Sequence, residues 1–257
     1  MECSHDLDHP GHSQNYEVNS ESELALRHND TAVLESHHAH MTFKILRREQ
    51  YNIFENLPRD KYRYCRKVML KCIIGTDMAK HFSLVERLSD RSAKVISKTS
   101  SRSGSSFVDL TERFSSESCS PADGKLKNDQ WVPFDADDES DRLELAEAIV
   151  HAADLSAQTA DYAMAKEWGR RVFQEFRNEV SLHERDGLTP PQFMKKAKTE
   201  YDEYRMQPSF INKVLLPIWE QLDELIGGLE NPIEKLRNNS KRYEEEASKL
   251  EKLGKQN

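Results

Sequence analysis

The sequence predicts an all-α protein, a compact multi-helix domain interrupted by one polar insertion. Apolar residues recur every three to four positions along most of the chain, which is the spacing of amphipathic helices. The 257 residues include only 9 Gly, and runs of β-branched residues are few, so a sheet-rich fold is not expected. The length suffices for one large domain or two small ones.

The N-terminal third is expected to begin with turns and continue as helices. Residues 1–20 are interpreted as loop and turns, and residues 21–56 as helical with a break near Asn29. A firm helix is predicted over 59–82, because Pro58 gives a start signal and the apolar positions that follow form one stripe. These segments supply most of the candidate site described below.

Residues 92–139 differ from the sequence on either side. Ten Ser lie between positions 97 and 120, and an acidic run closes the segment. Its short apolar patches are too small for a core. We therefore interpret 92–139 as a Ser-rich and acidic insertion, mostly disordered.

Helical periodicity resumes near residue 141 and continues almost to the end of the chain. One amphipathic helix is predicted from apolar residues in steps of four, namely Met164, Trp168, Val172, Phe176 and Val180. Another is predicted over 208–227, with a kink at Pro217.

The last segment, 229–257, is highly charged and is interpreted as a charged C-terminal helix or tail at the edge of the fold. A coiled coil with a partner is the weaker alternative, because Asn239 and Ser240 interrupt the apolar seam.

Composition narrows the classes of function. The net charge is −8 with no broad basic field, so nucleic acid is not expected as a partner. No apolar run approaches the roughly 18–20 residues that span a bilayer, and the first residues do not resemble a secretory signal. The four Cys form no CxxC pair, which favours reduced thiols and a cytoplasmic protein.

Two motifs combine imidazole and carboxylate groups. His5 and Asp6 are adjacent in HDLDHPG, where the imidazole suits zinc and a carboxylate can bridge two ions. His151 and Asp154 share a helix face in HAADLS. Each motif alone also fits a solvated polar surface, but two half-sites far apart in sequence are what a metal centre in a helical bundle needs.

A third motif joins Gln207 and Phe210, one helical turn apart. A Gln amide offers a donor and an acceptor, so by turning over it can match either edge of a purine. The Phe ring could stack on a base face. From these residues alone, an exposed Gln beside a core Phe is the better interpretation.

With these motifs taken together, the chain resembles the C-terminal two thirds of the catalytic domain of class I cyclic nucleotide phosphodiesterases. The resemblance covers about 1–95 and 140–225. The matching stretches come in the family's order: HDLDHPG (5–11), SELALRHNDTAVLESHH (22–38), TDMAKHF (76–82), HAADLS (151–156), EWGRRVFQEF (167–176), HERDGL (183–188) and QPSFINKVLLPIWE (207–220).

The resemblance implies an HD-like, metal-dependent phosphohydrolase domain that hydrolyses cyclic AMP or cyclic GMP to the 5′-nucleotide in signal transduction. Two divalent ions, Zn²⁺ and Mg²⁺ or Mn²⁺, would activate the attacking hydroxide. The implied roles, position by position, are metal ligation by His5, Asp6 and Asp154, orientation of metal-bound waters by His9, Glu35 and Thr76, and substrate contact by Gln207 and Phe210.

The sequence departs from the family pattern in three places, one of which is the 92–139 insertion. The family carries an upstream Tyr-His-Asn-x-x-His motif, which supplies the general acid and one more zinc ligand, and it does not occur in these residues. We therefore expect 1–228 to be a partial, catalytically incomplete domain, because loss of a general acid typically costs about 10²–10⁴ in rate. The second departure is Ala157, where many members have an Asn that contacts the base.

Several expectations remain open at this stage. A non-catalytic form that binds a cyclic nucleotide or a partner is the alternative function. A homodimer and a membrane-tethered longer form are compatible with the family. The choice between cyclic AMP and cyclic GMP and the identity of the second metal are not fixed by these residues.

Overall fold

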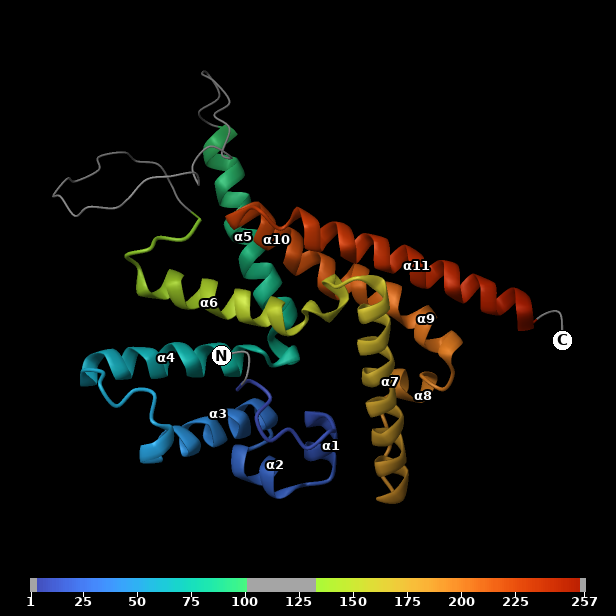
Figure 1. Cartoon of the computed structure of the whole chain (residues 1–257), viewed down its shortest axis with the longest axis horizontal. Coiled ribbons are helices and arrows are strands. Elements are labelled where there is room, and N and C mark those ends of the chain that lie inside the picture. Colours follow the sequence, from blue (N-terminus) through green and yellow to red (C-terminus); the bar gives the residue numbers. More distant parts are fainter. Residues whose placement is uncertain (1–3, 101–132, 255–257) are drawn as a thin grey trace.

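The computed structural model describes residues 4–100 and 133–254, and in these ranges it contains helices and no strand, which confirms the predicted all-α class (Figure 1). The α-helices are, in chain order, α1 (Gln14–Asn19), α2 (Glu23–His28), α3 (Val33–Leu46), α4 (Arg59–Gly75), α5 (His81–Ser100), α6 (Glu139–Asp154), α7 (Tyr162–Arg185), α8 (Gln192–Lys196), α9 (Glu200–Phe210), α10 (Leu216–Ile226) and α11 (Glu230–Gly254). Shorter turns are η1 (Glu49–Tyr51), η2 (Met78–Lys80), η4 (Ser156–Thr159) and the π-helical η5 (Ile211–Leu215).

One hydrophobic core joins α5, α6 and α10. Its buried residues are Leu84, Leu88, Ala148, Ala152, Ile218, Leu222 and Leu225. Helix α4 packs on α6, and α3 packs on α4, so the N-terminal helices lie outside this core as successive layers (Figure 1). No helix in the described parts of the chain has both the length and the apolar character needed to cross a bilayer.

A second core joins α9, η5 and α11. Its buried residues are Tyr204, Ile211, Leu215, Leu236, Tyr243 and Ala247. The half-buried Trp219 packs against both cores. The charged α11 predicted from the sequence is therefore a helix with one buried face, and its length lies along α9 and α10 (Figure 1).

Asn239 and Ser240 do not interrupt the packing of α11, contrary to the interpretation from sequence. Both are buried. The Asn239 amide donates to the carbonyls of Gln158 and Ala160, at 2.8 and 2.9 Å. The polar residues that were expected to interrupt the apolar seam of α11 thus connect this helix to η4 through the amide of Asn239.

The start of the chain is held by α7. The backbone N–H and the hydroxyl of Ser13 both donate to the Glu179 carboxylate, each at 2.7 Å. The Tyr16 hydroxyl donates to Asp186 at 2.5 Å, and its ring packs edge-on against His183. These contacts connect segments more than 160 residues apart and fix the HDLDHPG loop relative to the C-terminal helices.

The expectation of loop and turns throughout 1–20 is wrong at its end, where α1 forms. Ser13 is the N-cap, and its side chain accepts from the N–H of Tyr16. The predicted break in 21–56 is confirmed, because α2 ends at a left-handed Asn29 (φ 51°).

Helix α4 ends earlier than the predicted 59–82. Its last carbonyls find partners that sequence periodicity does not contain: the Thr76 hydroxyl donates to Ile73, and Lys80 Nζ donates to Ile74 at 2.9 Å. His151 Nδ1 lies 2.9 Å from the carbonyl of Gly75. These contacts satisfy the helix end and allow the chain to turn into α5.

Much of the predicted insertion, 101–132, lies outside the described residues. Its two ends, 92–100 and 133–139, are ordered, and this corrects the interpretation of 92–139 as mostly disordered at those positions. Helix α5 continues to Ser100. At the other end the acidic run starts α6, because Asp138 caps the helix and Asp141 pairs with Arg91 at 2.6 Å. The Arg91 guanidinium also covers the Phe134 ring.

Helix α7 forms as predicted, but its buried seam lies beside the apolar stripe on which the prediction rested. Ala165, Gly169 and Phe173 are buried, whereas Met164, Trp168 and Val172 are 44–59% exposed. Small residues in the seam allow neighbouring helices to approach closely, and hydropathy alone does not detect this.

The helix predicted over 208–227 is continuous in direction but is divided by η5. Pro217 has no N–H, so the carbonyl of Lys213, four residues earlier, loses its α-helical partner. The irregularity therefore lies in the turn before Pro217, where η5 takes π geometry, and Pro217 itself stands in the first turn of α10.

We expect Glu179→Ala to destabilise the protein by about 1–3 kcal/mol, because it leaves the partly buried donors of Ser13 without their carboxylate partner. Urea unfolding measures the change. Glu184→Ala, at an exposed position on the same helix, is the control and should stay within about 0.5 kcal/mol of wild type. Equal effects of the two variants would contradict the anchoring role of Glu179.

Candidate active site

Three predicted metal ligands converge in the structure. His5, Asp6 and Asp154 each offer one ligand atom, and these atoms all lie within 4.8 Å of one another. His5 Nε2 is 3.0 Å from Asp154 Oδ1 and 3.3 Å from Asp6 Oδ2. A loop at the start of the chain and the last residue of α6 thus present one imidazole and two carboxylates to a common point.

The electrostatics of this group favour a cation. The His5 ring donates to the carboxylates of Asp154 and, as the second cause, Asp6, and these contacts raise the pKa of His5 to about 10. The imidazole in turn lowers the pKa of Asp6. One nitrogen and two carboxylate oxygens form a donor set that suits Zn²⁺ and, through the carboxylates, Mg²⁺ or Mn²⁺.

Helix α3 holds the HDLDHPG loop in shape through two adjacent histidines. His37 Nε2 pairs with Asp8 Oδ2 at 2.9 Å, and His38 Nδ1 pairs with the carbonyl of Leu7 at 2.8 Å. Asp8 itself has a left-handed backbone (φ 65°), as does Gly11 (φ 80°), and these two positions reverse the chain. His37 and His38 lie in the stretch 22–38 that resembles the family, but no role was predicted for them from the sequence.

The predicted water-orienting residue His9 lies beside this group. Its ring stacks on His38 with centroids 5.6 Å apart, and its Nδ1 accepts from the N–H of Gly11 at 3.0 Å. An accepting Nδ1 leaves the proton of a neutral ring on Nε2. The Nδ1 of His38 faces the carbonyl of Leu7, which can only accept, so Nδ1 carries the ring proton. The unprotonated Nε2 of His38 then lies 3.9 Å from Asp6 Oδ1.

Glu35 and Thr76 lie on the same side of the structure. Burial, reinforced by the Asp77 and Asp6 carboxylates, raises the pKa of Glu35 to about 7, and its Oε2 is buried and has no hydrogen-bond partner within 4–100 and 133–254. Thr76 is buried at the end of α4 with its hydroxyl proton directed to Ile73. Their roles toward metal-bound water stay predictions.

His151 does not belong to the metal group, although the HAADLS motif suggested a shared face with Asp154. It is fully buried, and its Nε2 lies 2.9 Å from Nδ1 of His81. Burial lowers the pKa of both rings. The carbonyl of Gly75 requires a proton on Nδ1 of His151, so His81 must donate to its Nε2. This pair joins α6 to the start of α5.

The predicted substrate residues lie on α9, apart from the metal group in sequence. Gln207 is 6% exposed, packs against α7 and has a buried Oε1 without a partner among the described residues. Phe210 is 36% exposed. The better interpretation from sequence, an exposed Gln beside a core Phe, is therefore reversed. Their contact with a base stays a prediction.

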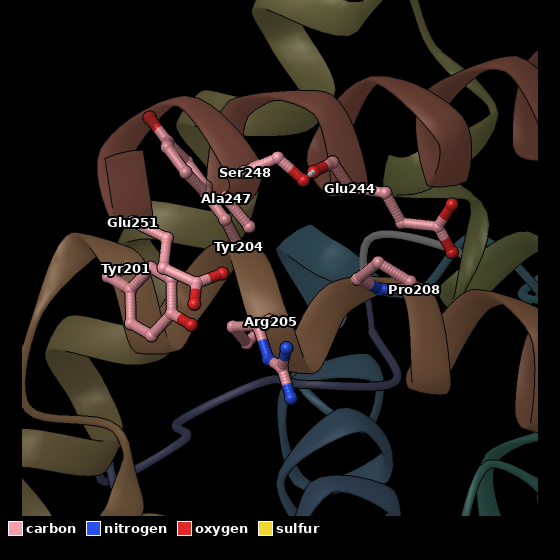
Figure 2. A pocket seen from close by; sticks show the side chains of 8 residues that line it. All are labelled: Tyr201, Tyr204, Arg205, Pro208, Glu244, Ala247, Ser248 and Glu251. Carbon is pink, nitrogen blue, oxygen red and sulfur yellow. Dashed lines mark hydrogen bonds between the residues drawn. The ribbon is translucent and has the colours of Figure 1, made fainter. Parts of the chain in front are cut away.

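A separate hollow of about 290 Å³ lies between α9 and α11 (Figure 2). Tyr201, Tyr204, Arg205 and Pro208 line it from α9, and four residues of α11 face them. None of the predicted site residues lines this hollow.

Comparisons with known proteins agree with the resemblance. Residues 2–236 match the family model described as 3′,5′-cyclic nucleotide phosphodiesterase. The chain therefore belongs to the 3′,5′-cyclic nucleotide phosphodiesterase family. It is 30% identical over 225 residues to the high-affinity cGMP-specific 3′,5′-cyclic phosphodiesterase 9A of Drosophila melanogaster, and 30% identical over 224 residues to isoform F of the 3′,5′-cyclic-AMP phosphodiesterase of the same organism.

A solved structure gives the same result for the fold. The phosphodiesterase domain of the Salpingoeca rosetta rhodopsin phosphodiesterase superposes with a TM-score of 0.79 at 28% sequence identity, over 98% of this chain and 66% of that chain. The two Drosophila matches cover 86% and 87% of this chain but only 12% and 29% of the relatives. This chain thus spans a part of each protein to which it is similar.

The pKa of Glu35 leads to a prediction about pH. A carboxyl whose pKa is about 7 in the folded state and about 4.5 in the unfolded state destabilises the fold progressively as pH rises between these values. Glu35→Gln removes the ionisation, so above pH 7 the variant should be more stable than wild type by about 2–3 kcal/mol.

Urea unfolding in the presence of a chelator, from pH 4.5 to 8, measures this difference. It should approach zero at pH 4.5, and Glu184→Gln at an exposed site should show no such trend. A difference between Glu35→Gln and wild type that does not change with pH would contradict the assignment.

Proposed function

We propose that this chain supplies most of a catalytic site that hydrolyses the 3′ ester of cyclic AMP or cyclic GMP to give the 5′-nucleotide. The observation that carries the proposal is the convergence of His5, Asp6 and Asp154 within 4.8 Å, from segments almost 150 residues apart. Membership of the phosphodiesterase family supports the reaction class.

The donor set fits divalent ions. His5 offers a nitrogen, and Asp6 and Asp154 offer carboxylate oxygens, of which Asp6 is the more exposed and is assigned as the bridging ligand. Two ions would supply Lewis-acid chemistry, lowering the pKa of water and neutralising phosphoryl charge. We assign Zn²⁺ to the nitrogen-containing position and Mg²⁺ or Mn²⁺ to the other.

The remaining residues act around this group. His9, with Nε2 carrying the proton of the neutral ring, can donate to an oxygen on the metal side, and Glu35, with its raised pKa, can take or release a proton near neutral pH. Gln207 would hydrogen-bond the purine and Phe210 would cover its face. The Drosophila relatives are named for cyclic GMP and for cyclic AMP respectively, so the similarity leaves the base open.

Metal binding provides the first test. Calorimetric titration of the metal-free chain with Zn²⁺ should show a site that Asp154→Ala weakens by more than the about 10–100-fold caused by loss of an outer-shell partner. Asp161→Ala, a neighbouring carboxylate with 88% side-chain exposure, is the control. Unchanged Zn²⁺ affinity in Asp154→Ala would contradict the assigned ligand set.

Turnover is the second test. Labelled cyclic AMP and cyclic GMP are incubated with residues 1–257 in Zn²⁺ and Mg²⁺, and release of the 5′-nucleotide is followed. Turnover that disappears in Asp154→Ala and persists in Asp161→Ala supports the proposal. Folded, metal-loaded protein without turnover contradicts catalysis by residues 1–257 alone and agrees with the expectation that these residues lack the general acid. Binding of a cyclic nucleotide or a partner by that protein, without hydrolysis, favours the alternative function.

The proposal extends to the location of the protein and to its partners. We propose a cytoplasmic protein of cyclic-nucleotide signalling whose partner is its substrate, without nucleic acid as a ligand. A homodimer and a membrane-tethered longer form stay predictions of the resemblance.

A further inference from the structure

Gly169 occupies an unexpected position in the interior of α7. Glycine is the least favourable residue in a helix interior apart from proline. The usual advantage of glycine is that it adopts a positive φ, and Gly169 does not use it. The described glycines with positive φ are Gly11, Gly187, Gly227 and Gly228. The reason for a glycine at this position must therefore be space.

That space is filled by the amide of Gln207. A Cβ on Gly169 would lie 2.7 Å from Gln207 Nε2 and 3.6 Å from its Cδ. The first distance is shorter than real contacts of a Cβ atom, so any side chain at position 169 must move the amide. The amide of the predicted base-reading residue thus rests directly on the backbone of α7.

A second side chain close to position 169 comes from α11. The hydroxyl of Tyr243 would lie 3.4 Å from a Cβ on Gly169. This hydroxyl donates to Oε1 of Gln158 at 3.3 Å, and the Gln158 amide donates to the carbonyl of Ala165 at 3.1 Å. Since both ends of this chain of contacts are buried, the Tyr243 hydroxyl is held in place beside position 169.

The Gln207 amide is the movable partner in this arrangement. Its Oε1 is buried without a hydrogen-bond partner among the described residues, so no acceptor contact fixes its orientation. It is also the far end of a flexible side chain, which can rotate without displacing α7 or α9. A methyl group at position 169 should therefore change the place of the amide at little cost to folding.

We propose that Gly169 is a positioning residue for base recognition: by lacking a side chain, it sets the depth at which the Gln207 amide meets a purine. This inference rests on the proposed function for its ligand class. It extends the predicted site to a residue of α7 that has no contact with the metal group and makes no hydrogen bond through a side chain.

The test uses Gly169→Ala in the whole chain, titrated calorimetrically with 5′-AMP and with 5′-GMP in the presence of Zn²⁺ and Mg²⁺. Loss of a well-placed amide hydrogen bond should weaken binding by about 3–10-fold. The Tm should be no lower than that of wild type, because Ala is the better helix former. Gly254→Ala, at a helical glycine with open space around it, is the matched control.

A double-mutant cycle separates positioning from a general effect. In a Gln207→Ala background, Gly169→Ala should cause no further loss of nucleotide affinity, because the atom that it displaces is gone. The side-chain amide resonance of Gln207 in a ¹⁵N spectrum gives a readout that needs no nucleotide, and it should shift in Gly169→Ala but not in Gly254→Ala.

The outcomes distinguish this inference from the proposed function. Wild-type binding of nucleotide, with the affinity and the amide resonance unchanged in Gly169→Ala, overturns the inference and leaves the function standing. A shifted resonance in a protein that binds neither nucleotide supports the positioning of Gln207 and overturns its role in base recognition. Equal losses of affinity in the presence and absence of Gln207 also overturn the inference.

Discussion

Two carboxylates directed at one imidazole form the interaction on which the candidate site depends. Asp6 lies near the start of the chain and Asp154 at the end of α6, and their proximity is tolerable only if positive charge lies between them. The proton on His5 supplies that charge at neutral pH, and a divalent ion bound by His5 would replace this proton with a greater charge. The supporting contacts serve this arrangement: His37 and His38 hold the loop from α3, and Glu179 holds it from α7.

Helix α7 lies next to both parts of the candidate site, the N-terminal loop of predicted metal ligands and the predicted base-contacting Gln207. Near the C-terminal end of α7, the Glu179 carboxylate accepts from Ser13, which follows the loop of predicted metal ligands. Its middle carries Gly169, on which the Gln207 amide rests, and its first turn is joined to η4, the segment that follows Asp154. A helix of 24 residues thus fixes the spacing between the predicted metal ligands and the predicted base-contacting Gln207, which no pair of local motifs could do.

Much of this structure could be predicted from the sequence. Periodicity is a local property, so the helices and the break at Asn29 follow from it. The convergence of Asp6 with Asp154 followed from motif order and resemblance. What failed depended on distant partners: α4 ends where Lys80 and His151 reach its carbonyls, and the seam of α7 is set by what packs on Gly169. Hydropathy records none of these contacts.

The π-helical turn η5 has a consequence for the evolution of the site. An α-helix turns the chain by about 100° per residue, whereas a π-helical turn holds about one residue more than an α-helical turn, so η5 accommodates an extra residue between Gln207 and α10. Ile218 and Leu222 must face the core of α5 and α6. The placement of Gln207 relative to this core therefore depends on η5, and a single-codon deletion within 211–215 that converts it to an α-helical turn would shift the amide relative to α7 with every site residue still present.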